Sequence, residues 1–218
     1  MNGLRAYWQS SIGKKQVMAV TGVLLAAWVT LHMVGNLQVF QGADAINHYA
    51  ALLQGMKGPL WAMRLGLLAA VALHAVAATQ LTLRNRAARP EAYAERAPQV
   101  STLAARTLRI GGVFLLVYII IHLMTFTVGN LHPDFIREDV YHNVLVVFRS
   151  PFKTAFYVLA MAALGLHLYH GVWSSLRSMG AARPSPEPRR RRVALVLALV
   201  VALGFAAVPL GVYFGLVK

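Results

Sequence analysis

Histidine is the residue type in this sequence whose placement most directly suggests chemistry. His32, His74, His122 and His167 each fall inside a different long uncharged stretch, and His170 follows His167 by one helical turn. A neutral imidazole can ligate a metal, relay a proton or bond to a neighbouring helix. Because ionisable side chains are costly in an apolar environment, their presence in four such stretches indicates a function.

The stretches that carry these histidines are long enough to cross a membrane. The composition agrees, because 58% of the 218 residues are hydrophobic and 13% are charged, whereas about a quarter of a soluble domain is charged. We therefore predict an all-α integral membrane protein, with residues 1–218 forming a single membrane domain. The predicted spans are residues 16–41, 65–83, 110–128, 154–176 and 193–217. The first four should form a bundle, with the histidine-free fifth helix outside it.

Positive charge predicts the orientation of these spans. Most of the 21 Lys and Arg residues lie near the N-terminus and in the second and fourth connections. By the positive-inside rule, the N-terminus is cytoplasmic and the C-terminus lies outside. The formal net charge of +14 is then explained by topology and anionic lipid, so we expect no nucleic-acid partner.

Two of the four histidines lie at one predicted depth. His74 precedes Arg84 by ten residues, and His167 precedes Arg177 by ten residues. At the rise of an α-helix, each imidazole lies roughly 15 Å from the inner charged boundary. Their spans, the second and the fourth, are diagonal partners in an up-and-down bundle.

The other two lie at a second depth, nearer the outside. His32 precedes Phe40 by eight residues, and His122 precedes Gly129 by seven. Both imidazoles are therefore roughly 10–12 Å from the outer ends of their helices. The first and third spans form the other diagonal, so the four histidines predict two pairs across the bundle core.

Two imidazoles that face each other at one depth across a bundle core are what a bis-histidine b-type haem requires. We therefore predict two haem b groups, an inner one on His74 and His167 and an outer one on His32 and His122. His170 remains the alternative to His167, and hydrogen bonding to a neighbouring helix remains the alternative for any one histidine. The chain has no Cys, which excludes iron–sulfur ligation and covalent haem attachment. No catalytic arrangement stands out, so we expect electron transfer without catalysis by this chain alone.

Several motifs in residues 10–180 resemble the cytochrome b subunit of succinate dehydrogenase or fumarate reductase, of the b558 family. They are MAVTG at 18–22, HMVGNL at 32–37, NHYA at 47–50, LTLRNRAARP at 81–90 and HLYHGVWS at 167–174. The resemblance implies a two-haem membrane anchor, with the family's axial histidines at the four positions named above. It also implies a multi-pass protein of the bacterial cytoplasmic membrane, bound on the cytoplasmic side to flavoprotein and iron–sulfur subunits.

The electron path implied by this resemblance belongs to the tricarboxylic acid cycle. Electrons would pass from succinate to the iron–sulfur subunit, then through the inner and outer haems to a quinone, which is usually menaquinone in this family. A quinone site needs polar groups beside an apolar slot. On the outer side we expect Gln38, Trp61 and Arg64 to provide them. The inner alternatives are Trp8, Ser10, Ser11 and Lys14.

Two other functions remain open at this point. One is the membrane cytochrome b anchor of a hydrogenase or a formate dehydrogenase, which also holds haem on histidines in a helical bundle. The other is a small transporter or channel whose pathway is lined by histidines. The spacing of the histidines along the chain and the loop motifs favour the succinate dehydrogenase type over the first alternative. A dithionite-reduced spectrum would distinguish a cytochrome from the second.

Overall fold

The computed structural model describes residues 3–88, 103–180 and 188–218. Arg89, Arg96 and Arg183, which contribute to the predicted inner positive charge, lie outside these residues. In the part described, five helices are long and apolar enough to cross a membrane, and no strand occurs. The prediction of an all-α membrane protein with five spans is confirmed. The spanning helices are α2 (Ser11–Asn36), α4 (Lys57–Ala87), α5 (Leu103–Leu123), α7 (Pro151–Ser178) and α8 (Pro188–Tyr213).

Several helix ends differ from the boundaries of the predicted spans. Helix α4 begins at Lys57 rather than residue 65, and α5 begins at Leu103 rather than residue 110. The prediction stopped at charged residues, whereas long Lys and Arg side chains continue a helix into the interface by extending their charged ends toward water. Helix α8 ends at Tyr213 rather than residue 217, shortly before Gly215 adopts a left-handed conformation with φ of +72°.

Local sequence signals explain where the other spans begin and end. The Ser10 side chain accepts a hydrogen bond from the Gly13 N–H at 2.8 Å and caps α2. Pro151 is the first residue of α7, where its missing N–H costs no helical hydrogen bond. Helix α5 continues into the π-helix η2 (Met124–Val128), which ends at Gly129 with φ of +89°. A Cβ atom at Gly129 would lie 2.5 Å from the ring of Phe135, so this turn requires glycine.

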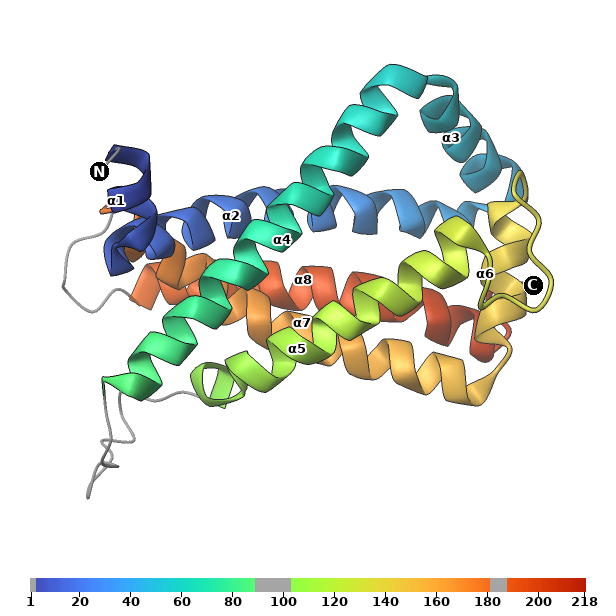
Figure 1. The fold of residues 1–218 in the computed structure, drawn as a ribbon. Helices are drawn as coiled ribbons and strands as arrows, with labels where there is room; N and C mark the ends of the chain where they lie inside the picture. The colour runs from blue at the N-terminus through green and yellow to red at the C-terminus, as the bar shows by residue number, and fades with distance from the viewer. Residues whose placement is uncertain (1–2, 89–102, 181–187) are drawn as a thin grey trace.

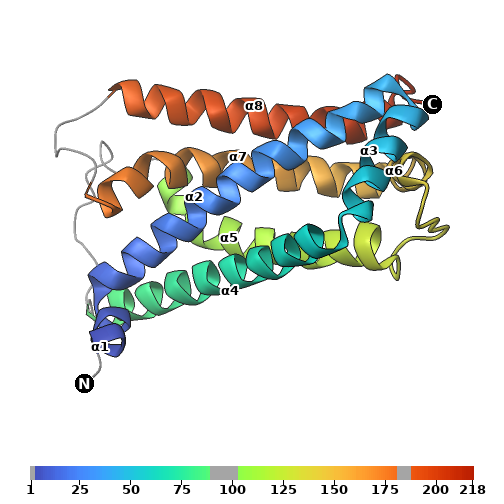
Figure 2. The same ribbon diagram turned by 90° about the horizontal axis from the view of Figure 1, so that it is seen from above.

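The spanning helices form a four-membered bundle with a fifth helix outside it. Helix α2 packs against α4 and α7, and α7 packs against α5. The order around the bundle is therefore α4, α2, α7, α5, which makes α2/α5 and α4/α7 the diagonal pairs. Helix α8 packs on α7 and α2, on the side away from α4 (Figure 2).

Short helices close the two ends of the bundle. The sequence analysis did not predict α3 (Ala43–Gly55) and α6 (Val140–Phe148), which pack together with η1 (Leu37–Gln41) and the end of α8. We call these four segments the outer cap. Its buried core includes Val39, Ile46, Val147, Phe148 and Val212. Helix α1 (Gly3–Gln9) lies at the opposite end of the bundle (Figure 1). An odd number of spans puts the two termini at opposite ends, and the end of α8 belongs to the outer cap.

Candidate functional site: two histidine pairs

The inner pair consists of His74 on α4 and His167 on α7. Their ring centroids are 6.1 Å apart, and the ring planes are inclined at 58°. Both rings approach a glycine on a neighbouring helix. A Cβ atom at Gly22 would lie 3.2 Å from Cε1 of His74, and one at Gly112 would lie 3.7 Å from Cε1 of His167. Glycine at position 22 therefore gives the His74 imidazole room, whereas a Cβ atom at Gly112 would make ordinary van der Waals contact with His167.

The outer pair consists of His32 on α2 and His122 on α5. Their ring centroids are 6.0 Å apart, and the ring planes are inclined at 79°. Thr21, which contacts His74 at 3.1 Å, precedes His32 by eleven residues on α2. The two pairs therefore lie at levels roughly 16 Å apart along the helix. The structure thus brings the four histidines together across the two diagonals expected from their depths.

An aromatic shell surrounds His122 of the outer pair. The Tyr118 ring stacks on His122 at 5.7 Å and 28°, and the rings of Phe126 and Tyr157 lie 5.5 and 6.1 Å away. Sequence reasoning missed this shell, although a signal was present. Tyr118 and Phe126 lie four residues to either side of His122, a spacing that places side chains on one helix face.

His32 has aromatic neighbours as well. The Trp28 ring stacks on it at 6.0 Å and 13°, and Phe205 of α8 lies 5.7 Å away. Trp28 follows the same four-residue spacing along α2. The fifth helix therefore contributes a ring to the surroundings of the outer pair, although it carries no histidine.

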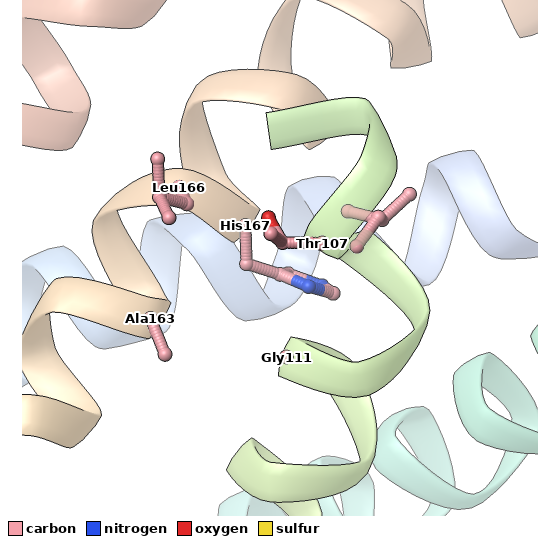
Figure 3. Close-up of a pocket in the computed structure, with 6 residues that line it drawn as sticks. Thr107, Gly111, Ala163, Leu166 and His167 are labelled. Carbon is pink, nitrogen blue, oxygen red and sulfur yellow. The ribbon is translucent and has the colours of Figure 1, made fainter. Parts of the chain in front are cut away.

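A small pocket beside His167 is lined by residues of α5 and α7. Figure 3 shows its imidazole extending from α7 toward α5, near Thr107 and Gly111. The other lining residues are Leu108, Ala163 and Leu166, so the walls are mainly apolar. Nδ1 of His167 is buried and has no hydrogen-bond partner among the described residues. The His167 imidazole therefore lies beside a small, mainly apolar pocket between α5 and α7.

His170 occupies a different position from His167. Its ring packs edge-on against Trp173, with centroids 5.5 Å apart, whereas His167 faces His74. Trp173 also lies beneath the guanidinium of Arg191, which is 4.8 Å from its ring centroid. This geometry favours His167 over His170 as the partner of His74.

The residues expected at a quinone site are only partly brought together. The Arg64 guanidinium lies 5.3 Å from the ring centroid of Trp61, and the Trp61 ring is largely exposed on α4. Gln38 lies in η1, a separate element of the outer cap. Of the inner alternatives, Lys14 is buried, and its amine donates a hydrogen bond to the carbonyl of Trp8. Ser10 is used as the cap of α2.

The donor set of each pair fits one haem iron. No cluster of three or more His, Asp or Glu suited to a bare metal ion occurs in residues 3–88, 103–180 or 188–218. A bis-histidine haem would take two protein ligands, because the porphyrin supplies the other four. A metal–imidazole bond is about 2 Å long and the ring centre lies about 1 Å further, so ligands on opposite sides of one metal have centroids about 6 Å apart. The observed separations of 6.1 and 6.0 Å match this value.

Comparison with known proteins yields one match. The family model described as succinate dehydrogenase/fumarate reductase transmembrane subunit matches residues 82–207, which is more than half of the chain. This region includes His122 and His167, whereas His32 and His74 precede it. Neither the search of curated proteins nor the search of solved structures finds a match.

Proposed function

The chain belongs to the family of succinate dehydrogenase/fumarate reductase transmembrane subunits, and from this premise we propose that it is a two-haem cytochrome b anchor. In this role it carries electrons between the iron–sulfur subunit of the complex and a membrane quinone. The single observation that carries the proposal is the presence of two histidine pairs at two levels of the bundle. In each pair the distance between ring centroids would fit one iron between the two imidazoles. The chain is a membrane subunit of an oxidoreductase complex and has no catalytic activity on its own.

The proposed roles of the histidines follow from their positions. His74 and His167 hold the inner haem, and His32 and His122 hold the outer haem. When bound, each haem supplies a one-electron redox centre. The centroid separations of 6.1 Å in the inner pair and 6.0 Å in the outer pair support this proposal, because they leave room for one iron between the two rings.

The flavoprotein and iron–sulfur subunits bind, in this proposal, at the end of the bundle that carries α1. Lys14, Arg84 and Arg177 lie at this end of the spanning helices. Positive charge places it on the cytoplasmic side of a bacterial membrane. The same charge is suited to an acidic face on a soluble partner subunit.

The quinone, which we propose to be menaquinone, binds near the outer haem at Arg64, Trp61 and Gln38. Arg64 precedes His74 by ten residues on α4, so it lies roughly 15 Å toward the outer end, close to the level of the outer pair. Substituting Arg64→Gln should raise the KM for a menaquinone analogue while haem content stays unchanged. Lys57→Gln on the same helix is the matched control, and an equal effect of both variants would contradict this site.

The function as a whole is tested by purification from membranes and by spectroscopy. The dithionite-reduced protein should show b-type α-bands, and it should copurify with a flavoprotein and an iron–sulfur protein. A protein without α-bands would be compatible with the transporter or channel alternative and would refute the cytochrome proposal. Copurification with a hydrogenase or formate dehydrogenase instead would refute the proposed partner assignment.

A further inference from the structure

We infer that Thr21 is a positioning residue for His74, holding the imidazole in one tautomer and lowering the reduction potential of the inner haem relative to a variant without the hydroxyl. This inference rests on the proposed function, because it concerns a haem bound by His74 and His167. It adds a residue on α2 to a pair formed by α4 and α7.

The hydrogen bonds of Thr21 determine which atom donates to which. Its Oγ1 atom lies 2.7 Å from the carbonyl oxygen of Val17 and 3.1 Å from Nδ1 of His74. A hydroxyl has one proton, and the shorter contact to a carbonyl can only be made by donating it. Oγ1 must therefore accept from the Nδ1–H of His74, whose ring also has a hydrogen bond with the Met18 backbone. This arrangement leaves Nε2 as the nitrogen with a free lone pair.

The surroundings protect this contact. Thr21 is 6% exposed, so its hydroxyl is shielded by protein. The neighbouring Gly22 allows the His74 ring to approach the α2 backbone, since a Cβ atom there would be 3.2 Å from Cε1. The hydroxyl is itself anchored to its own helix through Val17. The ring is thus held against α2 at a fixed rotation.

The other three paired histidines have different polar contacts. Nδ1 of His122 and Nδ1 of His167 are buried without partners among the described residues. The Asn36 amide nitrogen lies 3.3–3.4 Å from the ring nitrogens of His32, and an amide nitrogen is a donor rather than an acceptor. Among the residues described, His74 is therefore the paired histidine whose ring N–H donates to a side-chain acceptor, the Thr21 hydroxyl.

Donating this hydrogen bond changes the properties of His74 as a proposed iron ligand. An imidazole that donates its second N–H to an acceptor is oriented by it and becomes a more basic ligand. A more basic axial ligand stabilises the oxidised iron more than the reduced iron, so the potential of that haem falls. Hydrogen bonding around the ligands is one of the means by which a protein tunes a haem.

The test uses the full chain purified from membranes with its partner subunits, in four forms. These are the unaltered protein, Thr21→Val, Thr21→Ser and the matched control Thr30→Val. Thr30 lies on the same helix, and its hydroxyl donates to the Ala26 carbonyl at 2.7 Å, as Thr21 does to Val17. Haem content is measured first, and each haem is then titrated potentiometrically.

We expect Thr21→Val to shift the reduction equilibrium of the inner haem toward the reduced form by up to about tenfold, which is about 59 mV for a one-electron couple. The outer haem should be unchanged, and Thr21→Ser and Thr30→Val should both match the unaltered protein. If Thr21→Val fails to assemble, Thr21→Ala is titrated instead, with the same expectation. Loss of the inner haem alone in both variants, with retention in Thr21→Ser, would also support the inference.

Two results would overturn it while leaving the proposed function intact. In the first, both haems are present in Thr21→Val with unaltered potentials. In the second, Thr21→Ser behaves like Thr21→Val, which would show that shape rather than the hydroxyl matters. Absence of haem from the unaltered protein is a separate outcome, which refutes the proposed function on which the inference rests.

Discussion

The inner and outer histidine pairs have nearly the same separation but very different surroundings. The centroids are 6.1 Å apart in the inner pair and 6.0 Å apart in the outer pair. Small and hydroxyl-bearing residues, including Thr21, Gly22 and Gly112, adjoin the inner pair. Aromatic rings surround the outer pair and connect it with the outer cap. In the proposed function the common separation serves iron ligation, and the different surroundings distinguish one site from the other.

The largest expected effect comes from removing one ligand of either pair. His122→Leu should abolish the outer haem and His167→Leu the inner haem, because each proposed bis-histidine site then keeps only one of the two side chains that hold its haem. Each variant should therefore retain about half of the haem, as measured by the pyridine haemochrome assay. His170→Leu is the matched control for His167→Leu and should retain both haems. Loss of the inner haem in His170→Leu but not in His167→Leu would reverse the assignment.

The next largest effect is expected from filling the space that glycines leave beside the inner histidine pair. At Gly22 an added Cβ would lie 3.2 Å from the His74 ring, whereas at Gly112 it would lie 3.7 Å from the His167 ring. Gly22→Ala must displace the ring, and overpacking of this kind costs about 1–3 kcal/mol. We expect reduced occupancy of the inner haem in Gly22→Ala and normal occupancy in Gly112→Ala, both measured by haem titration. Equal occupancy in the two variants would count against a close fit at His74.

Tyr118 allows the aromatic side of the comparison to be tested. Its ring stacks on His122, and aromatic pairs contribute about 0.5–1.5 kcal/mol beyond the area they bury. Tyr118→Leu should change the electron paramagnetic resonance signal of the outer haem and leave that of the inner haem unaltered. Tyr118→Phe retains the ring and should give the original spectrum. A change in both haem signals would mean that the two environments are not separate.

The depths of the histidines in the membrane could be predicted because charged residues mark where the spanning helices end. Arg84 and Arg177 mark the inner boundary, and the fixed helical rise converts sequence distance from them into depth for His74 and His167. The diagonal arrangement of the helices that carry them followed from bundle topology. Depth and bundle topology do not depend on side-chain packing, so both could be estimated from the sequence.

The features that were missed depend on packing between elements. The contact between Thr21 and His74 requires a particular rotation of α2 against α4, and depth alone does not determine it. Helices α3 and α6 are too short to form a membrane-spanning pattern, and their stability comes from the shared core of the outer cap. The start of α4 at Lys57 was missed because hydropathy falls at Arg64, although the helix continues through it.

The smallest expected effects lie in the outer cap, which adjoins one pair and not the other. The Asp139 carboxylate accepts hydrogen bonds from the His142 backbone N–H and from the Asn47 side chain, each at 2.9 Å. First the His142 N–H and then the Asn47 amide lower the pKa of Asp139 below its ordinary value of 3.8. A lowered folded-state pKa stabilises the cap at pH above that value, and this contribution is lost as the pH falls through the folded pKa.

Asp139→Ala should therefore destabilise the cap by about 1 kcal/mol at neutral pH, within the range for loss of a helix cap. The acid-induced loss of stability below pH 4 should become smaller in this variant. Asp134→Asn is the comparison variant, because Asp134 forms an exposed ion pair with His142 at 2.9 Å, and such pairs contribute less than about 1 kcal/mol. Thermal unfolding of the purified protein measures both variants, and a larger loss in Asp134→Asn would contradict the role given to Asp139.

The central claim is that each histidine pair holds one haem, and the ratio of haem to chain tests it most directly. The full chain is purified from membranes with its partners, haem b is quantified as the pyridine haemochrome, and protein is quantified by amino-acid analysis. We predict two haem b groups per chain, which titrate as two separate components. A ratio of one would contradict the assignment of one of the pairs, and a ratio of zero would contradict the account as a whole.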